Sequence, residues 1–313
     1  MGPSNNADVS VVILTRNSAR TLERCLESVV REDPGEIIAV DGLSTDETRG
    51  ILRRYGVEVI IDPTGSLGHS RQLGVEAAAG IYVMFVDSDV RLGIDCIRRL
   101  RRDLEEHGWG VVMARVLSAE NASYWQKAEK EIVSFSFPRH YDVDGSSREF
   151  VDTRAALFKR ELLLRYAFDS YFKPSAEDQD LGRRLLEDGY QLGVSDAIIH
   201  HYDRREFFAF MRQRFRWGLG TARLGVKYGD MGICLTLCLT PLITALSETI
   251  RTVAAGSFYL VPYWLCNGLA QSLGVVVGLR SARSSFKRTQ IGRSGSSQAG
   301  ENESGVHALR NGQ

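Results

Sequence analysis

Cysteine is scarce in this chain, and its distribution forms no recognisable scaffold. No C-x-x-C pair occurs, which argues against a zinc site or a disulfide framework. A few scattered cysteines are typical of a protein that works in a reducing, cytoplasmic environment. The five are Cys25, Cys96, Cys234, Cys238 and Cys266.

The chain also lacks net charge and a signal-peptide pattern. Its 39 basic and 39 acidic residues cancel, so no overall attraction to a polyanion such as nucleic acid is expected. The start of the chain is polar through Asp8, so no signal peptide is predicted. A glycine-rich phosphate-binding loop with an adjacent Lys is also missing from the sequence, which argues against some nucleotide-binding classes.

An alternation of strand-like and helix-like segments fills the first third of the chain. Each of the first four apolar, β-rich runs is followed by an amphipathic helical pattern. This alternation predicts an α/β fold with a doubly wound, mainly parallel sheet and flanking helices. The segment 118–150 is interpreted as a partly helical insertion with a mobile loop. Strands are predicted at 9–14, 37–40, 57–61, 82–86, 111–116, 150–152, 155–159, 191–194 and 197–199.

Polar side chains follow the first four predicted strands. Ligands of parallel α/β sheets bind beyond the carboxyl ends of the strands, so we expect these side chains to lie at one rim. Asp87 and Asp89 are candidate ligands of Mg²⁺ or Mn²⁺, because hard cations bind carboxylates and substrate phosphates. An isolated Asp-Ser-Asp is more often a capping turn. The rim residues are Thr15, Arg16, Asn17, Asp41, Arg71, Asp87, Ser88 and Asp89.

Two further groups of titratable residues occur later in the chain. Glu177 and Asp178 begin an acid-rich helical segment, where acids are also favoured by the helix dipole alone. His200 and His201 follow a predicted strand, and one of two adjacent histidines can be a metal ligand while the other packs.

The last third of the chain predicts helices at a membrane. Residues 204–228 form a basic, aromatic amphipathic helix of the kind that lies in a membrane interface; a nucleic-acid surface is the less favoured reading. Two apolar segments, 231–250 and 257–279, have the length of membrane spans. The basic residues before and after them predict a hairpin with both ends in the cytoplasm. The alternative is a buried helical pair of a soluble domain.

Six short motifs in this order resemble the family 2 inverting glycosyltransferases of the GT-A fold, in particular membrane-attached members with a Q-x-x-R-W element. The resemblance covers about residues 8–218. In the second motif, Gly42-Leu43 replaces the more frequent Asp-Gly, which leaves Asp41 as the clearer base-recognition candidate. The motifs are Val12–Asn17, Val40–Thr48, Gly68–Gly74, Val86–Asp89, Glu177–Asp178 and Gln213–Trp217.

The resemblance implies a role for each candidate residue. Asp178 would be the general base, with Glu177 beside it. Asp87 and Asp89 would hold Mg²⁺ or Mn²⁺ against the donor diphosphate, and His200 or His201 would complete that site. The substrate-binding residues would be Thr15, Arg16 and Asp41 near the base and ribose, Arg71 near the base or the phosphates, and Gln213, Arg216 and Trp217 beside the acceptor or diphosphate, together with Asn17 and Ser88.

Together these inferences predict a membrane-bound enzyme with a cytoplasmic catalytic domain. The predicted parts are a flexible start (1–7), a catalytic domain (8–203), an amphipathic interface helix (204–228), two transmembrane helices (229–280) and a disordered tail (281–313). The leading hypothesis is an inverting, metal-dependent transfer from a UDP- or GDP-linked sugar to a lipid-linked glycan or polyprenyl phosphate. The alternatives are a nucleotidyltransferase, which would release pyrophosphate, and a non-catalytic membrane scaffold that binds a sugar nucleotide.

Overall fold

A computed structural model describes residues 6–118, 123–136, 151–202, 206–229 and 231–282 of the chain. Residues 283–313 of the predicted disordered tail and the loop part of the predicted insertion lie outside these residues, whereas the first two residues of that tail, 281 and 282, end the last helix. The elements are β1 (Asn6–Thr15), α1 (Ala19–Arg31), β2 (Pro34–Asp41), α2 (Thr48–Arg54), β3 (Glu58–Ile61), α3 (Leu67–Ala77), β4 (Tyr82–Asp87), β5 (Val90–Leu92), α4 (Cys96–His107), β6 (Val111–Ser118), α5 (Tyr124–Ser136), β7 (Ala155–Lys159), α6 (Arg160–Arg165), α7 (Glu177–Glu187), β8 (Leu192–His201), α8 (Phe207–Lys227) and α9 (Met231–Ala254). A last helix, Phe258–Ala282, begins with the 3-10 turn η2 (Phe258–Leu260).

The described strands form one mixed sheet in the order β3-β2-β1-β4-β7-β6-β8-β5. The pairs β1–β2, β1–β4, β2–β3 and β6–β8 are parallel. The pairs β4–β7, β6–β7 and β5–β8 are antiparallel. The sheet was predicted to be mainly parallel, and it is mixed: β7 and β5 run antiparallel to their neighbours. The prediction missed this because apolar periodicity reports which face a side chain occupies and not the direction of the strand.

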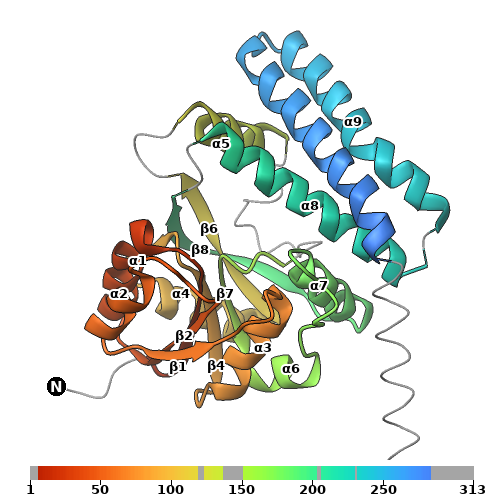
Figure 1. The fold of residues 1–313 in the computed structure, drawn as a ribbon. Coiled ribbons are helices and arrows are strands. Elements are labelled where there is room, and N and C mark those ends of the chain that lie inside the picture. Colours follow the sequence, from red (N-terminus) through yellow and green to blue (C-terminus); the bar gives the residue numbers. More distant parts are fainter. Residues whose placement is uncertain (1–5, 119–122, 137–150, 203–205, 230, 283–313) are drawn as a thin grey trace, which may run out of the picture.

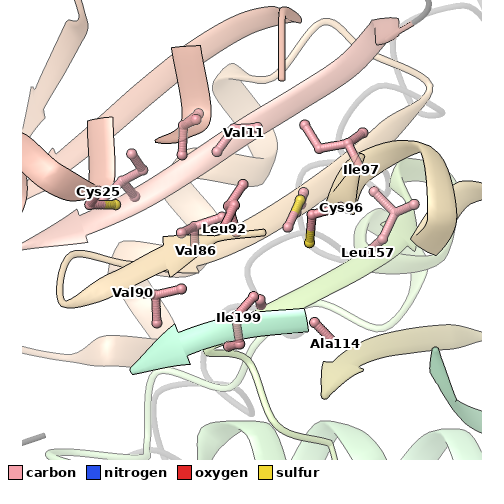
Figure 2. Packing of buried hydrophobic residues seen from close by; sticks show 14 of the residues in the cluster. Val11, Cys25, Val86, Val90, Leu92, Cys96, Ile97, Ala114, Leu157 and Ile199 are labelled. Atoms are coloured by element: carbon pink, nitrogen blue, oxygen red, sulfur yellow. The ribbon is translucent and has the colours of Figure 1, made fainter. Parts of the chain in front are cut away.

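Helices cover both faces of the sheet (Figure 1). One core packs β1 side chains such as Val11 and Ile13 against α1, α2 and α4 (Figure 2). The other packs Val12, which points the opposite way from the same strand, against α3, α6 and α7. A strand that is buried on both faces has a continuous apolar sequence, which is why the first runs were recognisable as strands.

Several strands differ from the sequence prediction. Residues 151 and 152, the described part of the strand predicted at 150–152, are not in a strand. Strand β1 already begins at Asn6, inside the segment predicted to be flexible, and the buried Asn6 side chain donates to the carbonyl oxygen of Glu32 at 2.6 Å. The two short strands predicted at 191–194 and 197–199 are one strand, β8. The short strand β5 was not predicted; it directly follows Asp89 and pairs antiparallel with the end of β8, Val90 opposite His201.

Helix α8 and the last helix pack closely together through small residues. A Cβ added to Gly218 would lie 2.1 Å from the carbonyl oxygen of Gln271, and one added to Gly274 would lie 2.1 Å from that of Phe215. Gly278 is in similar contact with Ala222. Small residues four apart on both helices allow such close approach. The predicted amphipathic helix is thus a helix, but one of its faces is covered by the last helix.

The described residues contain one helix that is long and apolar enough to cross a membrane, Phe258–Ala282, and 44% of its apolar window is buried. A core helix of a soluble protein can meet the same criteria. Helix α9 packs on this helix at Gly268, whose added Cβ would lie 2.6 Å from the Cβ of Ala245. The transmembrane hairpin therefore stays a prediction.

Candidate functional site

A large open cavity of about 1910 Å³ lies beyond the carboxyl ends of β1 and β4. It is the place where ligands of such sheets bind. Its wall combines loops after β1 and β4, the start of α7, and side chains of α8, α9 and the last helix. The predicted residues that line it are Thr15, Arg16, Asn17, Arg71, Asp87, Ser88, Asp89, Glu177, Asp178, His201, Gln213, Arg216 and Trp217. Asp41 and His200 are not among the lining residues.

Asp87 ends β4 and Asp89 lies in the turn that leads to β5, and the segment Asp87–Asp89 is called the acidic turn below. The backbone N–H of Asp87 donates to the carbonyl oxygen of Arg154 at 3.0 Å, and the carbonyl oxygen of Asp89 accepts the N–H of Tyr202 at 2.8 Å. Burial and the charge of Asp89 raise the pKa of Asp87 to about 6, against the opposing effects of Arg71 and His201. Two carboxylates that disfavour each other's charge are suited to a cation held between them.

The geometry fits a divalent cation that shares its ligands with a substrate. Among the described residues, no three His, Cys, Asp or Glu side chains converge closely enough to hold a metal by themselves. Mg²⁺ commonly uses one or two carboxylates and completes its shell with substrate phosphates and water, and Asp87 and Asp89 supply such a pair. His201 Nε2 lies 3.3 Å from Asp89 Oδ1. Since neighbours on a strand point to opposite faces, His200 points away from the cavity.

Asp41, the predicted base-recognition residue, is fully buried and bonded within the protein. Its carboxylate accepts hydrogen bonds from Thr15 Oγ1 at 2.9 Å, Ser44 N at 2.8 Å and Ser44 Oγ at 2.5 Å. It therefore joins the end of β1 to the loop after β2, and it is Gly42 that lines the cavity there. Direct contact between Asp41 and a base stays a prediction that would need these bonds to rearrange.

The loop after β1 is fixed to the acidic turn. Asn17 has a positive φ of 52°, which Asn tolerates better than most residues, and its side-chain oxygen accepts the N–H of Thr45 at 2.8 Å. Ser88 Oγ and Ser18 Oγ form a hydrogen bond of 2.8 Å. Arg16 extends from this loop into the cavity wall. The three predicted residues Arg16, Asn17 and Ser88 are thus brought together.

Arg71 and Glu177 form a buried ion pair between α3 and α7. The Arg71 guanidinium lies beside the rings of Phe85 and Phe168, 5.8 and 5.9 Å from their centres, and its Nη2 lies 3.9 Å from Asp87 Oδ1. Glu177 is therefore a counter-ion that holds Arg71 beside the acidic turn. A carboxylate in that position does not have free access to a substrate proton.

Asp178 is better placed than Glu177 to take a proton. It lines the cavity at the first turn of α7, where its Oδ1 accepts the N–H of Gln179 at 2.8 Å and its Oδ2 lies 3.5 Å from Thr153 Oγ1. Burial raises the pKa of Asp178; Arg71 opposes this rise and Asp152 adds to it. A carboxylate with a raised pKa is a more effective base near neutral pH.

The predicted Q-x-x-R-W element lies on α8 and is organised around Arg214, which the sequence prediction did not select. Arg214 is 1% exposed, lies 4.0 Å from the Trp217 ring centre and donates to Tyr263 Oη at 3.0 Å. Glu129 of α5 forms an ion pair with it. Gln213 and Arg216, the predicted residues beside it, both line the cavity.

Sequence reasoning also missed Asp152 and Arg154 in the cavity wall. Arg154 Nε lies 2.9 Å from both carboxylate oxygens of Asp152. Burial acts to raise the pKa of Asp152, but Arg154 outweighs it and the pKa is lowered. In the sequence, Asp152 and Arg154 are an acid and a base separated by one residue, a spacing that is equally compatible with an ordinary surface ion pair. Only the sheet order brings it to the cavity.

Residues 10–166 of the chain match the family model of glycosyl transferase family 2. Over 209 residues, 62% of this chain, the sequence is 30% identical to a poly(ribitol-phosphate) beta-glucosyltransferase of Bacillus spizizenii. Over 132 residues, 39% of this chain, it is 26% identical to the poly(ribitol-phosphate) beta-N-acetylglucosaminyltransferase TarS of Staphylococcus aureus. The matched parts cover 32% and 23% of those relatives, so the chain spans a third of their length or less.

The fold is also similar to a solved structure. The crystal structure of GalNAc-T7 with UDP, GalNAc and Mn²⁺ matches 64% of this chain and 45% of that chain, with a TM-score of 0.52 and 15% identity. This likeness concerns the fold alone. It confirms the predicted GT-A-like α/β architecture with its flanking helices.

Proposed function

This chain belongs to glycosyl transferase family 2, and from that premise we propose that it moves a sugar from a nucleotide-diphosphate donor to an acceptor at a membrane surface. The predicted class, a glycosyltransferase, is confirmed at the level of the family. The observation that carries the proposal is that Asp87, Asp89 and Asp178 line one cavity at the carboxyl ends of the strands. That cavity contains a pair of acids for a diphosphate-bound cation and a separate acid for the acceptor.

The reaction we propose is a single displacement with inversion. An acceptor hydroxyl oxygen bonds to the anomeric carbon, the bond from that carbon to the donor phosphate breaks, and the nucleoside diphosphate leaves with the electron pair. Asp178 takes the hydroxyl proton, which its raised pKa favours near neutral pH. Arg71, held by Glu177, faces the negative charge that develops on the leaving group.

Asp87 and Asp89, with His201 beside Asp89, are the residues that would hold Mg²⁺ or Mn²⁺. When bound, the cation would stabilise the charge of the departing diphosphate. The base of the donor, UDP- or GDP-type, is expected beside Thr15, Arg16 and Asn17. Both curated relatives are named as acting on poly(ribitol-phosphate) and as beta-transferases, which supports an acceptor hydroxyl and an inverting reaction in this chain.

The proposal of a membrane site depends on the outer face of the last helices. Large apolar side chains of α9 and of Phe258–Ala282 face away from the rest of the protein: Leu242, Ile243, Leu246, Ile250, Leu265, Leu269, Leu273, Val276 and Val277. Contiguous apolar patches of this kind mark membrane or protein interaction sites. We propose that the acceptor is lipid-linked and that the α/β domain lies on the cytoplasmic side, with transfer to a glycan hydroxyl or to a polyprenyl phosphate.

The experiment is a donor screen with the purified full chain in nanodiscs, measuring release of nucleoside diphosphate with and without Mg²⁺ or Mn²⁺ and with membrane-lipid extract as acceptor. Asp89→Ala should reduce release at least ~100-fold, and Asp178→Asn should reduce transfer to a hydroxyl acceptor by about 10²- to 10⁴-fold. Asp196→Asn, on β8 and outside the cavity lining, is the matched control. Undiminished, metal-independent release by the Asp89 variant would remove the acidic turn from the site; release of pyrophosphate would indicate a nucleotidyltransferase.

A further inference from the structure

The cavity continues beyond the predicted donor residues into the C-terminal helices. Its lining there includes Thr240 and Thr244 of α9, and Trp264, Asn267 and Gln271 of the last helix. These side chains are polar or carry a polar group, although the outer surface of the same two helices is apolar. A helix pair with one apolar outer face and a polar inner face towards a cavity is arranged to receive a polar ligand.

Trp264 provides an unused hydrogen-bond donor in this part of the cavity. The side chain is only 3% exposed, and within the described residues its Nε1 has no hydrogen-bond partner. Buried Trp N–H groups usually have a partner, because leaving one without a bond is unfavourable. A ligand oxygen in the cavity would supply the missing acceptor.

Asn267 and Gln271 lie one turn apart on the same helix. Gln271 Nε2 donates to Asn267 Oδ1 at 2.7 Å. An amide has two donor hydrogens and an acceptor oxygen, so the linked pair still presents donors and an acceptor to the cavity. Such mixed, uncharged groups match hydroxyl groups, which both donate and accept.

One buried charge beside this region is already paired within the protein. The buried cation, Arg214, is paired with Glu129, donates to Tyr263 Oη and lies against the Trp217 ring. A buried charge that already has its counter-ion offers little to a second anion. Arg214 therefore offers little to a phosphate, whereas the indole N–H and the two amides match a neutral group with several hydroxyls.

We propose that Trp264, Asn267 and Gln271 form an acceptor subsite for a neutral polyhydroxylated unit, a sugar or polyol. This inference rests on the proposed function and specifies its acceptor: the reacting group is a carbohydrate hydroxyl and not a polyprenyl phosphate. The ring of Trp264 and the two amides orient the unit, and its hydroxyl oxygen accepts the Trp264 N–H. The three residues are specificity determinants and do not touch the donor.

The test uses the full chain in nanodiscs, a preferred nucleotide sugar from the donor screen, and acceptor probes of defined chemistry. The probes are octyl glycosides of glucose, galactose, mannose and N-acetylglucosamine, with farnesyl phosphate as the anionic alternative. We expect one or more glycosides to stimulate release of nucleoside diphosphate, and farnesyl phosphate not to. Trp264→Phe, which removes only the N–H and keeps a ring, should raise the half-saturating glycoside concentration about tenfold, as should Asn267→Ala.

The control is Leu269→Ala, on the outer face of the same helix, which should leave that concentration unchanged. The KM for the nucleotide sugar should stay within about twofold in all variants. Stimulation by farnesyl phosphate alone, no stimulation by any glycoside, or an unchanged half-saturating concentration in both subsite variants would overturn the subsite. Failure of the wild-type chain to release a nucleoside diphosphate from any donor would instead overturn the proposed function.

Discussion

The ionised carboxylate of Asp87 destabilises the folded state of the protein. Its side chain is about a third exposed (34%) and close to Asp89, and together burial and like charge raise its pKa from 3.8 to about 6. A raised pKa means that the folded chain binds a proton here more tightly than the unfolded chain does. The folded state is therefore destabilised as the pH rises through this range, as is common where a site needs charge.

We predict that Asp87→Asn stabilises the chain in the absence of metal and nucleotide. A shift of about two pKa units corresponds to ~3 kcal/mol at most, and partial exposure to solvent reduces this to about 1 to 2 kcal/mol. The gain should be present at pH 7.5, above the folded pKa, and should vanish near pH 3.8, where Asp87 is largely protonated in the folded state. Urea unfolding at both pH values measures it. If Asp87→Asn were less stable than the wild type at pH 7.5, the ionised Asp87 would not be destabilising. The same variant should lose transferase activity.

Glu177 is expected to act on stability and not on proton transfer. It is buried with Arg71, and removing one partner of a buried ion pair costs about 3 to 5 kcal/mol. We predict that Glu177→Gln lowers the free energy of unfolding by about 3 kcal/mol or more. Glu187→Gln is the control, since its pair with Arg183 lies on the exposed side of the same helix, and it should change stability by less than about 1 kcal/mol.

A second measurement separates the two roles of the acids on α7. With saturating metal, which keeps Asp87 ionised, the pH profile of transfer should keep its acidic limb in any folded Glu177→Gln enzyme and lose it in Asp178→Asn, because Asp178 is then the group that must be deprotonated. The raised pKa of Asp178 places this limb above the range of an ordinary Asp. Loss of the limb in the Glu177 variant would reverse the assignment.

At the scale of elements, the contact between α8 and the last helix depends on glycine. A side chain at Gly274 would meet the Phe215 carbonyl oxygen at 2.1 Å, and backbone cannot move aside as a flexible side chain can. Helix α8 also joins the α/β domain, where Ser175 Oγ donates to the carbonyl oxygen of Arg216 at 2.7 Å. The last helix is thus positioned over the cavity through α8.

We predict that Gly274→Val separates the last helix from α8 while the α/β domain remains folded. Overpacking of a close contact costs about 1 to 3 kcal/mol or more, and here the cost falls on one helix pair. Limited proteolysis should show faster cleavage in 255–282 and unchanged resistance in 6–118. Val276→Ala, at an exposed position of the same helix, is the control. Equal resistance of both variants would mean that the helix pair does not depend on this contact.

At the scale of the whole molecule, the outer face of the last helices is the surface that we expect to meet lipid. Leu246 and Leu273 are 59% and 58% exposed there. We predict that Leu246→Lys with Leu273→Lys moves the protein from the membrane pellet into a high-salt or carbonate wash, since charged residues in hydrocarbon are costly. The control is lysine at Leu164, an exposed leucine of α6 in the α/β domain. Unchanged retention of the double variant would argue against this face as the membrane contact.

The sequence by itself determined the first half of the fold and selected most of the residues that the structure brings to the cavity wall. The runs 9–14 and 82–86 are apolar because both faces of their strands are buried. A continuous apolar run is a local pattern, so the two strands could be recognised from the sequence. The acids Asp87, Asp89 and Asp178, which line the cavity, could be selected as candidates for a similar reason, because their residue types and order belong to short motifs. The helical character of 207–227 was equally visible from its periodicity.

Only the tertiary structure decided which of these residues face each other. Asp41 and Glu177 look like Asp87 and Asp178 in the sequence, but hydrogen bonds from Ser44 and an ion pair with Arg71 occupy them. His201 was separated from His200 by the pairing of β5 with β8, which places one of them beside Asp89. The direction of each strand, the burial of each polar side chain and the partner of each charged group depend on residues far apart in the chain. A local sequence pattern therefore cannot predict them.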